Sequence, residues 1–405
     1  MRSLDRVTSM TRVLVTDGDE RAALAVTRAL GRQGVEVIVG AEKQPSLAAT
    51  SKYCAQSVAY PSPYRDPSGF LDCLQEIVVR EKVDALFPIS DIAMHVIGPK
   101  KSEFEVHTRM PIPDHQAFEA ISDKYNLMKL AQELKVAIPD TIFVPDGNIQ
   151  PVLDGIASFP VVVKPACSLI RHEKGWQKTA VHYANDKSEL RDLYRRHDYL
   201  MRPSLVQRRV LGQGQGVFVL MNESLPLAMF AHRRLREKPP SGGVSVLRES
   251  IPLEKALVDP ALRLLRHVRW HGVAMVEFKV DRATRTPILM EINGRFWGSL
   301  QLAIDAGMNF PWLLLQMAAG EAVGLPDNSY RCGIKSRWLL GDLDHLLMRL
   351  WKPRAALNLP PGSPSKWRCL RDFADCFDRD TFYEIEKLGD VGPFLYELRQ
   401  YAKLN

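Results

Sequence analysis

Two glutamates, an asparagine and an arginine in one predicted β-hairpin are the side chains best suited to chemistry. Their segment reads VEFKVDRATRTPILMEINGR, two apolar stretches joined by a polar turn. Because successive side chains of a strand alternate between faces, Glu291, Asn293 and Arg295 share one face. A hairpin centred near Thr284 places Glu277 directly opposite Glu291. Like charges there, with Cβ atoms roughly 5 Å apart, destabilise the pairing.

A divalent cation would resolve the conflict between these carboxylates. The apolar neighbours predict burial, and burying two unpartnered carboxylates costs on the order of several kcal/mol. Oxygen atoms from Glu277, Glu291 and Asn293 suit Mg²⁺, which also takes waters and substrate phosphates as ligands. In the alternative interpretation, Arg295 and Lys279 neutralise the pair in an ordinary salt-bridge network.

Two lysines occupy positions that favour anion binding. Lys164 ends the apolar strand PVVVKP, and lysines in buried strands are uncommon unless the ammonium group meets an anion. Lys124 follows Asp123 at a predicted helix start, where the helix dipole disfavours a structural cation and favours a phosphate. An exposed Lys124 without a ligand fits the sequence equally well.

A glycine-rich and an arginine-rich segment lie farther along the chain. The first, QRRVLGQGQG from Gln207, has glycines that give a weak phosphate-loop signal and also fit a hairpin turn with positive φ. The second, HRRLREKPPSGG from His232, carries Arg234 and Arg236, and guanidinium groups bind carboxylates and phosphates bidentately. A solvated basic face is the alternative for this segment.

The elements around these residues predict several domains in a chain of 405 residues. Residues 12–40 read as strand, helix and strand, and a further helix and strand follow, which predicts an α/β domain with a parallel sheet over 11–115. Residues 116–325 mix strands and helices without strict alternation, as α+β regions do. Residues 326–405 form a C-terminal extension with an amphipathic helix at 338–350, whose role the sequence does not give.

Composition is that of a globular protein, with 46% hydrophobic and 25% charged residues. No apolar run reaches the ~20 residues of a membrane helix, and the first ten residues do not resemble a signal peptide, so we expect a cytoplasmic location without integral membrane contact. The scattered cysteines favour free thiols. The net charge of +7 suits an enzyme that handles phosphates, and without a recognised motif we expect no nucleic-acid partner.

Taken in order, these motifs resemble the ATP-grasp superfamily of carboxylate–amine ligases. The resemblance covers about residues 11–325 and implies a two-lobed ATP-binding module, with a small lobe at about 120–205 and a large lobe at about 206–325. The five motifs that carry it follow in the family's order: Asp123-Lys124, Val161–Pro165, Val206–Val210, Glu277-Phe278 and Glu291–Arg295.

The resemblance implies a role for each motif residue. The implied reaction activates a carboxylate as an acyl-phosphate and couples it to an amine, with amino acids or small peptides as substrates. Three arginines would be catalytic: Arg295 would stabilise the acyl-phosphate and the charge that develops on transfer, while Arg234 and Arg236 would meet either the γ-phosphate or the substrate carboxylate. The implied contacts of ATP are Lys124 and Lys164 at the phosphates and Gln207, Arg208 and Val210 at the adenine. The implied ligands of one or two Mg²⁺ ions, or of Mn²⁺, are Glu277, Glu291 and Asn293.

The sequence departs from the family pattern at two places. The loop 166–178 holds only Gly175 where many relatives have several glycines, so His172, Lys174 or Lys178 would replace backbone amides at the phosphates. Arg208 stands where many relatives have Glu. An ATP-dependent carboxylase, a kinase-like enzyme and a non-catalytic nucleotide-binding regulator therefore remain alternatives, and a homo-oligomer is possible.

Overall fold

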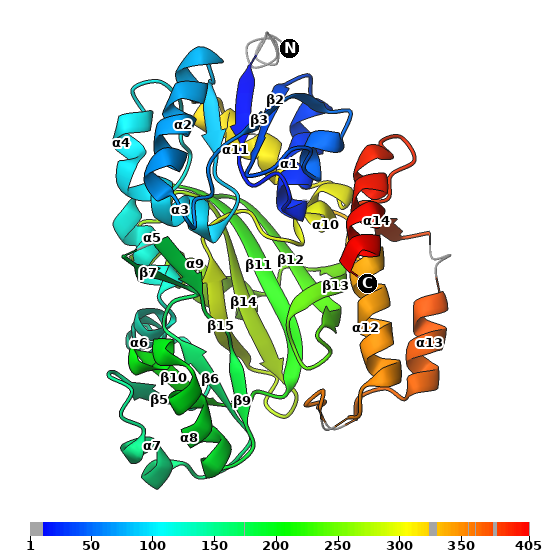
Figure 1. Ribbon diagram of the computed structural model, residues 1–405. Helices are drawn as coiled ribbons and strands as arrows, with labels where there is room; N and C mark the ends of the chain where they lie inside the picture. Colours follow the sequence, from blue (N-terminus) through cyan, green and yellow to red (C-terminus); the bar gives the residue numbers. More distant parts are fainter. Residues whose placement is uncertain are drawn as a thin grey trace.

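The computed structural model describes residues 11–173, 175–323, 330–354, 356–360, 362–375 and 379–404. Figure 1 shows an N-terminal domain and a small lobe at opposite ends of one large sheet. The C-terminal helices lie along the side of this sheet that carries β13. Within these ranges, no helix combines the length and the apolar character needed to cross a bilayer. Lys174, one of the expected phosphate ligands, lies outside the described residues.

The N-terminal domain is the parallel α/β unit that the sequence predicts. Its four strands pair in parallel in the order β3-β2-β1-β4. Strand β3 was not predicted, because Ala55, Gln56 and Ser57 are exposed and leave no apolar alternation. The elements are β1 (Arg12–Val15), α1 (Arg21–Gly31), β2 (Glu36–Ala41), β3 (Cys54–Ala59), α2 (Pro67–Arg80), β4 (Ala85–Phe87), α3 (Asp91–Ile97) and α4 (Lys101–Phe104).

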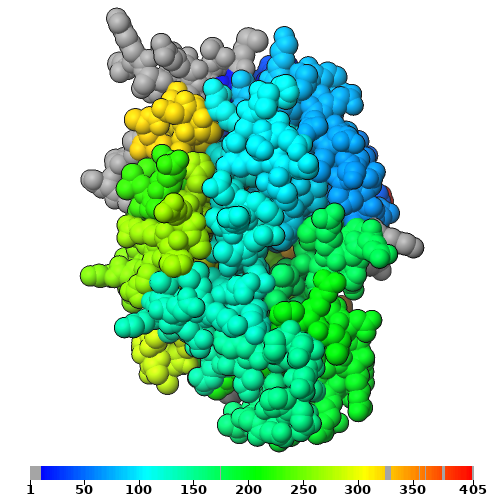
Figure 2. Space-filling view, turned by 90° about the vertical axis from the view of Figure 1, so that its left-hand side faces the viewer, coloured from blue at the N-terminus to red at the C-terminus, as the bar shows by residue number. Residues whose placement is uncertain are grey.

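The small lobe is a four-stranded antiparallel sheet in the order β5-β10-β6-β9. Helices α5 (His115–Ser122) and α6 (Lys124–Glu133) lead into it. In the segment 166–178, β7 (Leu169–His172) and β8 (Gly175–Lys178) pair as a separate antiparallel hairpin, in which Leu169 and Ile170 are buried. The other elements are β5 (Thr141–Val144), α7 (Gln150–Gly155), β6 (Val161–Pro165), β9 (His182–Ala184), α8 (Lys187–Arg196) and β10 (Ser204–Arg208). Figure 2 shows the face on which the N-terminal domain, blue to cyan, stands above this lobe, teal to green.

The large lobe is built on a seven-stranded sheet in the order β15-β14-β11-β12-β13-β16-β17. Alternation along β11 divides two cores: Val217 and Val219 pack with α9, whereas Phe218 and Leu220 pack with α11. The elements are β11 (Gly212–Asn222), β12 (Leu225–Lys238), β13 (Val244–Ile251), α9 (Lys255–His267), β14 (Gly272–Asp281), β15 (Pro287–Asn293), α10 (Leu300–Asp305) and α11 (Phe310–Ala318).

The glycines of the segment that begins at Gln207 lie inside β11 rather than in a hairpin turn, and none of the three has a positive φ. A Cβ atom at Gly212 would lie 2.1 Å from the carbonyl oxygen of Val280, and one at Gly216 would lie 2.5 Å from Nε2 of His232. These positions therefore need glycine because neighbouring strands approach closely.

The C-terminal segment completes the large sheet. Strand β16 (Lys335–Arg337) pairs with β13, and β17 (Thr381–Tyr383) pairs in parallel with β16. The amphipathic helix expected at 338–350 is α12 (Leu339–Trp351), and it is followed by α13 (Lys366–Ala374) and α14 (Gly392–Leu404). The sheet therefore extends beyond residue 325, where the sequence places the end of the large lobe.

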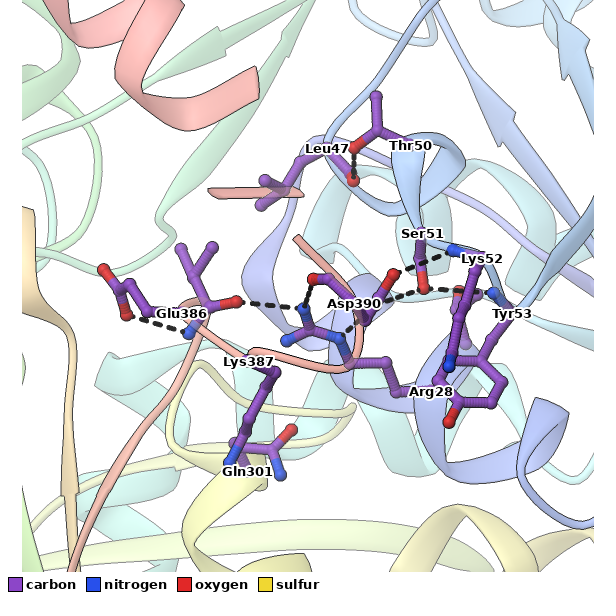
Figure 3. A network of polar contacts seen from close by, with 12 residues as sticks. Arg28, Leu47, Thr50, Ser51, Lys52, Tyr53, Gln301, Glu386, Lys387 and Asp390 are labelled. Atoms are coloured by element: carbon purple, nitrogen blue, oxygen red, sulfur yellow. Dashed lines mark hydrogen bonds and ion pairs between the residues drawn. The ribbon is translucent and has the colours of Figure 1, made fainter. Parts of the chain in front are cut away.

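A network of buried hydrogen bonds connects this segment to the N-terminal domain (Figure 3). Nε of Arg28 donates to Oδ2 of Asp390 over 2.7 Å, and the two side chains are only 2% and 1% exposed. Asp390 also accepts from Oγ of Ser51 at 2.6 Å and from the backbone N–H of Lys52 at 2.8 Å. Residues about 360 positions apart in the chain thus form one packed unit.

Candidate nucleotide and metal site

A cavity of about 470 Å³ lies between the small lobe and the large sheet. One wall comes from β6 and from residues 207–210, which end β10 and lead out of it and are called the hinge here. The other wall includes residues of β14 and β15. Nine of the predicted site residues line it: Lys164, Gln207, Arg208, Val210, Arg234, Glu277, Glu291, Asn293 and Arg295. Lys124 lies beside it, while Arg236 lies elsewhere.

The two carboxylates face each other in the register that the sequence predicts. Glu277 pairs with Glu291 across β14 and β15, and a bulge follows directly after Glu277. Asn293 Nδ2 donates to Oε1 of Glu277 over 3.2 Å, and Arg234 donates to its Oε2. Arg234, rather than Arg295 or Lys279, is therefore the cation in direct contact with Glu277.

Burial and nearby charge act on the two carboxylates in opposite directions. Burial raises the pKa of Glu277, and this effect outweighs the contribution of Arg234. Burial also acts on Glu291, but Lys124 and Lys164 outweigh it and lower the pKa of that carboxyl group. Glu291 is therefore the more readily ionised carboxyl group of the pair.

The residues present fit a divalent cation. Glu277, Glu291 and Asn293 offer oxygen donors from adjacent strands, which is the donor type that Mg²⁺ takes. A cation between the carboxylates would favour the charged form of Glu277, which burial alone disfavours.

Both predicted lysines lie next to the carboxylates. Lys124, the first residue of α6, is only 8% exposed, so the exposed alternative is wrong. Its Nζ donates to Oγ of Ser168 over 2.7 Å and lies 3.9 Å from Oε2 of Glu291. Burial lowers the pKa of Lys164 to about 8, although Glu291 opposes the shift. The cavity thus holds a lysine that an anion would stabilise.

The hinge residues close the far end of the cavity. Gln207 is 1% exposed, and its Nε2 donates to Oγ1 of Thr141 over 3.0 Å. Its Oε1 is a buried acceptor without a partner among the described residues. Nε of Arg208 donates to Asp140 over 2.6 Å, so this side chain turns toward the small lobe.

Arg295 is held by a carboxylate of the N-terminal domain. Its Nε and Nη2 donate to Oδ1 and Oδ2 of Asp91 over 2.8 and 2.7 Å. Asp91 begins α3, and Ser90 caps that helix by accepting from the backbone N–H of Ala93. The sequence marks Asp91 only as a residue after a strand, because nothing local indicates a partner 204 positions away.

The other two arginines of the predicted catalytic set diverge. Arg234 lies between Glu277 and Glu237 and lines the cavity. Arg236 donates to both carboxylate oxygens of Asp342 on α12, over 2.7 and 2.6 Å. A bulge in the pairing of β12 with β13 between the two arginines directs their side chains to different places.

Comparison with known proteins supports the architecture. Residues 219–338 match the family described as ATP-grasp in the biosynthetic pathway with Ter operon, and no curated protein matches the chain. The L-amino acid ligase from Bacillus licheniformis is similar in structure, with 15% identity, a TM-score of 0.63, and coverage of 80% of this chain and 78% of that one.

Two further structures are similar over comparable lengths. Biotin carboxylase from Campylobacter jejuni has 14% identity and a TM-score of 0.60, covering 82% of this chain and 75% of that one. N5-carboxyaminoimidazole ribonucleotide synthetase from Thermotoga maritima has 16% identity and a TM-score of 0.56, covering 80% and 79%. The fold is therefore that of ATP-grasp proteins. Residues 219–338 also match an ATP-grasp family, in agreement with the resemblance that the ordered motifs carry.

Proposed function

We propose that this protein is an ATP-dependent ligase that activates a carboxylate as an acyl-phosphate and couples it to an amine. The observation that carries the proposal is that Lys124, from α6, meets Glu291 of the β14–β15 hairpin, which with Glu277 and Arg295 lines the cavity. Phosphoryl transfer requires mainly such positioning and charge neutralisation. The similarity to an L-amino acid ligase favours amino acids or small peptides as substrates.

ATP would extend from the hinge to the carboxylate pair. The partnerless Oε1 of Gln207 is an acceptor that the adenine amino group would satisfy, and Val210 would pack beside the base. Lys164 and Lys124 would hold the phosphates. Arg208 would contribute its backbone carbonyl group, because its backbone N–H already donates to the carbonyl oxygen of Asp140 over 2.9 Å.

Glu277, Glu291 and Asn293 would hold one or two Mg²⁺ ions, or Mn²⁺. The metal supplies neutralisation of the charge on the transferring phosphoryl group. Arg234 and Arg295 contribute fixed positive charge on either side of the pair, and Asp91 is the positioning residue that orients the guanidinium group of Arg295.

A second, smaller cavity of about 280 Å³ would receive the carboxylate substrate. It shares Arg295 and Gly298 with the nucleotide cavity. The rest of its lining combines polar residues that include Ser90, Ser168 and Lys178 with the carboxylates Glu20 and Asp91 and apolar residues such as Ile89. A carboxylate oxygen held beside Arg295 would attack the γ-phosphorus while the bond to ADP breaks. The amine would then attack the acyl carbon, lose a proton and release phosphate.

The test is phosphate release from ATP, measured with amino acids singly and in pairs, with simple amines, and with bicarbonate. We expect release that requires a carboxylate and an amine together. Glu291→Gln should lower it by at least about a hundredfold, or ~2.7 kcal/mol of barrier, because the metal loses a charged ligand. Glu133→Gln, an exposed change on α6, is the matched control.

Other outcomes would replace the proposal. Release that bicarbonate alone stimulates would indicate a carboxylase. Tight ATP binding without release in any mixture would indicate a regulator. Turnover of Glu291→Gln equal to that of the control would remove the assignment of the metal site.

A further inference from the structure

A separate cavity of about 690 Å³ lies between the large sheet and the C-terminal helices. Its walls come from β11, β12, the turn between β14 and β15, helices α12 and α13, and the residues Leu359, Ser363 and Pro364. In Figure 1, α12 stands beside β13, and α13 lies on the outer side of α12. It shares only Gly214, Arg234 and Glu237 with the nucleotide cavity. Its volume is in the range of small-molecule sites, about 300–1,000 Å³.

Most of this cavity lies behind the sheet face that carries the carboxylate pair. Gly216 pairs with Glu277, whereas the preceding Gln215 pairs with Phe278. Since neighbouring residues of a strand point to opposite faces, Gln215 points away from Glu277 and lines the second cavity. A ligand there would not occupy the proposed position of ATP.

The lining of the cavity is strongly basic. Among the described residues it includes seven arginines and lysines but only three carboxylates. The cations come from several elements that fold together, including β12 (Arg236), the β14–β15 turn (Arg282 and Arg285), β16 (Lys335) and α12 (Arg349). Glu277 pairs with Arg234, and Asp342 pairs with Arg236 and Arg337, but cations still outnumber carboxylates around this enclosed space, and a bound anion would stabilise them.

Two guanidinium groups of this lining are fixed in place. Arg236 is held by both oxygens of Asp342. Arg349 donates to the carbonyl oxygen of Pro364 and to the Sγ of Cys369 at 3.5 Å. Such immobilised groups lose little entropy when they bind a ligand. At the same wall, Oε1 of Gln215 is buried without a hydrogen-bond partner among the described residues, which leaves an acceptor for a ligand hydroxyl or amine.

We propose that this cavity binds a small molecule that carries two or more phosphate or carboxylate groups. Guanidinium groups recognise both kinds of oxyanion with paired hydrogen bonds, and several of them around one cavity select for multiple negative charges. The site is additional to the proposed ATP site. It does not depend on the ligase reaction, and either proposal can fail without the other.

Calorimetric titration of the full-length protein tests the proposal. Pyrophosphate and propane-1,2,3-tricarboxylate represent the phosphate and carboxylate sources, and acetate is the singly charged control. The protein is first saturated with a non-hydrolysable ATP analogue, with Mg²⁺ in excess over every anion and constant ionic strength. We expect one saturable site for at least one of the two polyanions, tighter than acetate by at least about tenfold, and weaker binding at higher salt.

A pair of double variants locates the site. Arg282→Glu with Arg285→Glu changes two exposed residues of the hairpin turn and should weaken polyanion binding by at least about tenfold. Arg195→Glu with Arg196→Glu makes the same change of net charge on exposed α8, remote from the cavity, and should leave the affinity within about twofold. Circular dichroism checks that both variants fold.

Three results would overturn the proposal. The first is the absence of saturable binding for both polyanions. The second is an equal loss of affinity in the two double variants, which would indicate attraction by net charge alone. The third is binding that the ATP analogue abolishes, which would place the anion in the nucleotide cavity.

Discussion

At the residue scale, the cavity between the small lobe and the large sheet combines groups that are individually unfavourable in a protein without ligands. Glu277 and Glu291 are paired like charges, and Lys164 is an ammonium group with a depressed pKa. A bound phosphate or metal ion would stabilise each of these groups. Ligand binding would therefore offset the destabilisation that they cause in the free protein.

Lys164→Met separates the role of this lysine in binding from its effect on stability. Burial lowers the pKa of Lys164 to about 8, against 10.5 for an ordinary lysine. Between these values the unfolded chain binds more protons, so this group makes the parent more stable as the pH rises from 8 to 10.5. At pH 7 the variant lacks a buried charge, and we expect a Tm no lower than that of the parent together with ATP affinity reduced by at least about tenfold, or ~1.4 kcal/mol.

The pH dependence of ATP binding gives a second readout for the same variant. Phosphates favour the ammonium form, so ATP binding to the parent should take up a proton near pH 8.5 and weaken as the pH rises further. Calorimetry in buffers of different ionisation enthalpy measures this uptake, and the variant should lose it. Equal proton uptake in parent and variant would mean that Lys164 does not meet the phosphates.

Local patterns reveal one part of the site at this scale. Alternation and turn position correctly predict that Glu277 faces Glu291. The contacts of Arg295 with Asp91 and of Arg234 with Glu277 are not predictable in this way, because they depend on how distant elements pack. The roles of these residues in ATP and metal binding stay predictions.

At the element scale, strand β11 connects the two cavities and belongs to both cores. Gly214 lines both cavities, and the strand continues into residues that pack alternately with α9 and α11. The spacing of its glycines resembles that of a phosphate loop, but glycine is required in β11 because the neighbouring strands approach it closely. Sequence spacing does not distinguish these causes, since both call for the absence of a side chain.

Gly212→Ala tests this explanation. The added Cβ atom would lie 2.1 Å from the carbonyl oxygen of Val280, so β11 and β14 must separate, and we expect a loss of about 1–3 kcal/mol in the free energy of unfolding. Gly155→Ala, at the end of α7, has no atom within 4 Å of the new Cβ and should be neutral or slightly stabilising. Urea denaturation compares the two, and equal stabilities would contradict the packing argument.

The strands that the sequence analysis did not predict lack the long apolar runs of the strands that it did predict. Strand β13 begins directly after the segment whose arginines and glycines indicate a basic loop, and its Val246 and Leu247 are buried where the strand pairs with β12 and β16. The β7–β8 hairpin is short and largely polar. Strands with strong apolar patterns, such as β6 and β14, are found close to their predicted positions because burial on both sides dictates their composition.

At the scale of the whole molecule, the C-terminal segment contacts both the large sheet and the N-terminal domain. It adds β16 and β17 to the large sheet and then contacts the N-terminal domain through Arg28 and Asp390. Glu384, also buried, pairs with Arg21 of α1 and Arg248 of β13. The composition of this segment gave no role for it, because the contacts that place it in the fold are with distant parts of the chain.

Asp390→Asn tests whether these contacts hold the molecule together. The change keeps the shape of the side chain but leaves the buried guanidinium group of Arg28 without its counter-charge. Breaking a buried ion pair in this way costs about 3–5 kcal/mol. We therefore expect a loss of that size in urea denaturation, with faster amide exchange in residues 384–404. Glu76→Gln removes a pair with Arg80 whose side chains are 71% and 52% exposed, and it should cost less than about 1 kcal/mol.

The pH dependence of the difference identifies the charge as the cause. Burial tends to raise the pKa of Asp390, but hydrogen bonds from Ser51, Arg28 and Lys52 outweigh it and lower the pKa below its ordinary value of 3.8. The stability that this carboxylate contributes is therefore fully present above that value and is lost as the pH falls through the folded-state pKa. The gap between parent and Asp390→Asn should be constant from pH 5 to 8 and narrow in stronger acid. If the difference in the free energy of unfolding between parent and variant stays constant down to the lowest pH at which the parent folds, the loss would be due to packing rather than to charge. If amide exchange in the variant becomes faster only in the N-terminal domain, the C-terminal segment would dock without this ion pair.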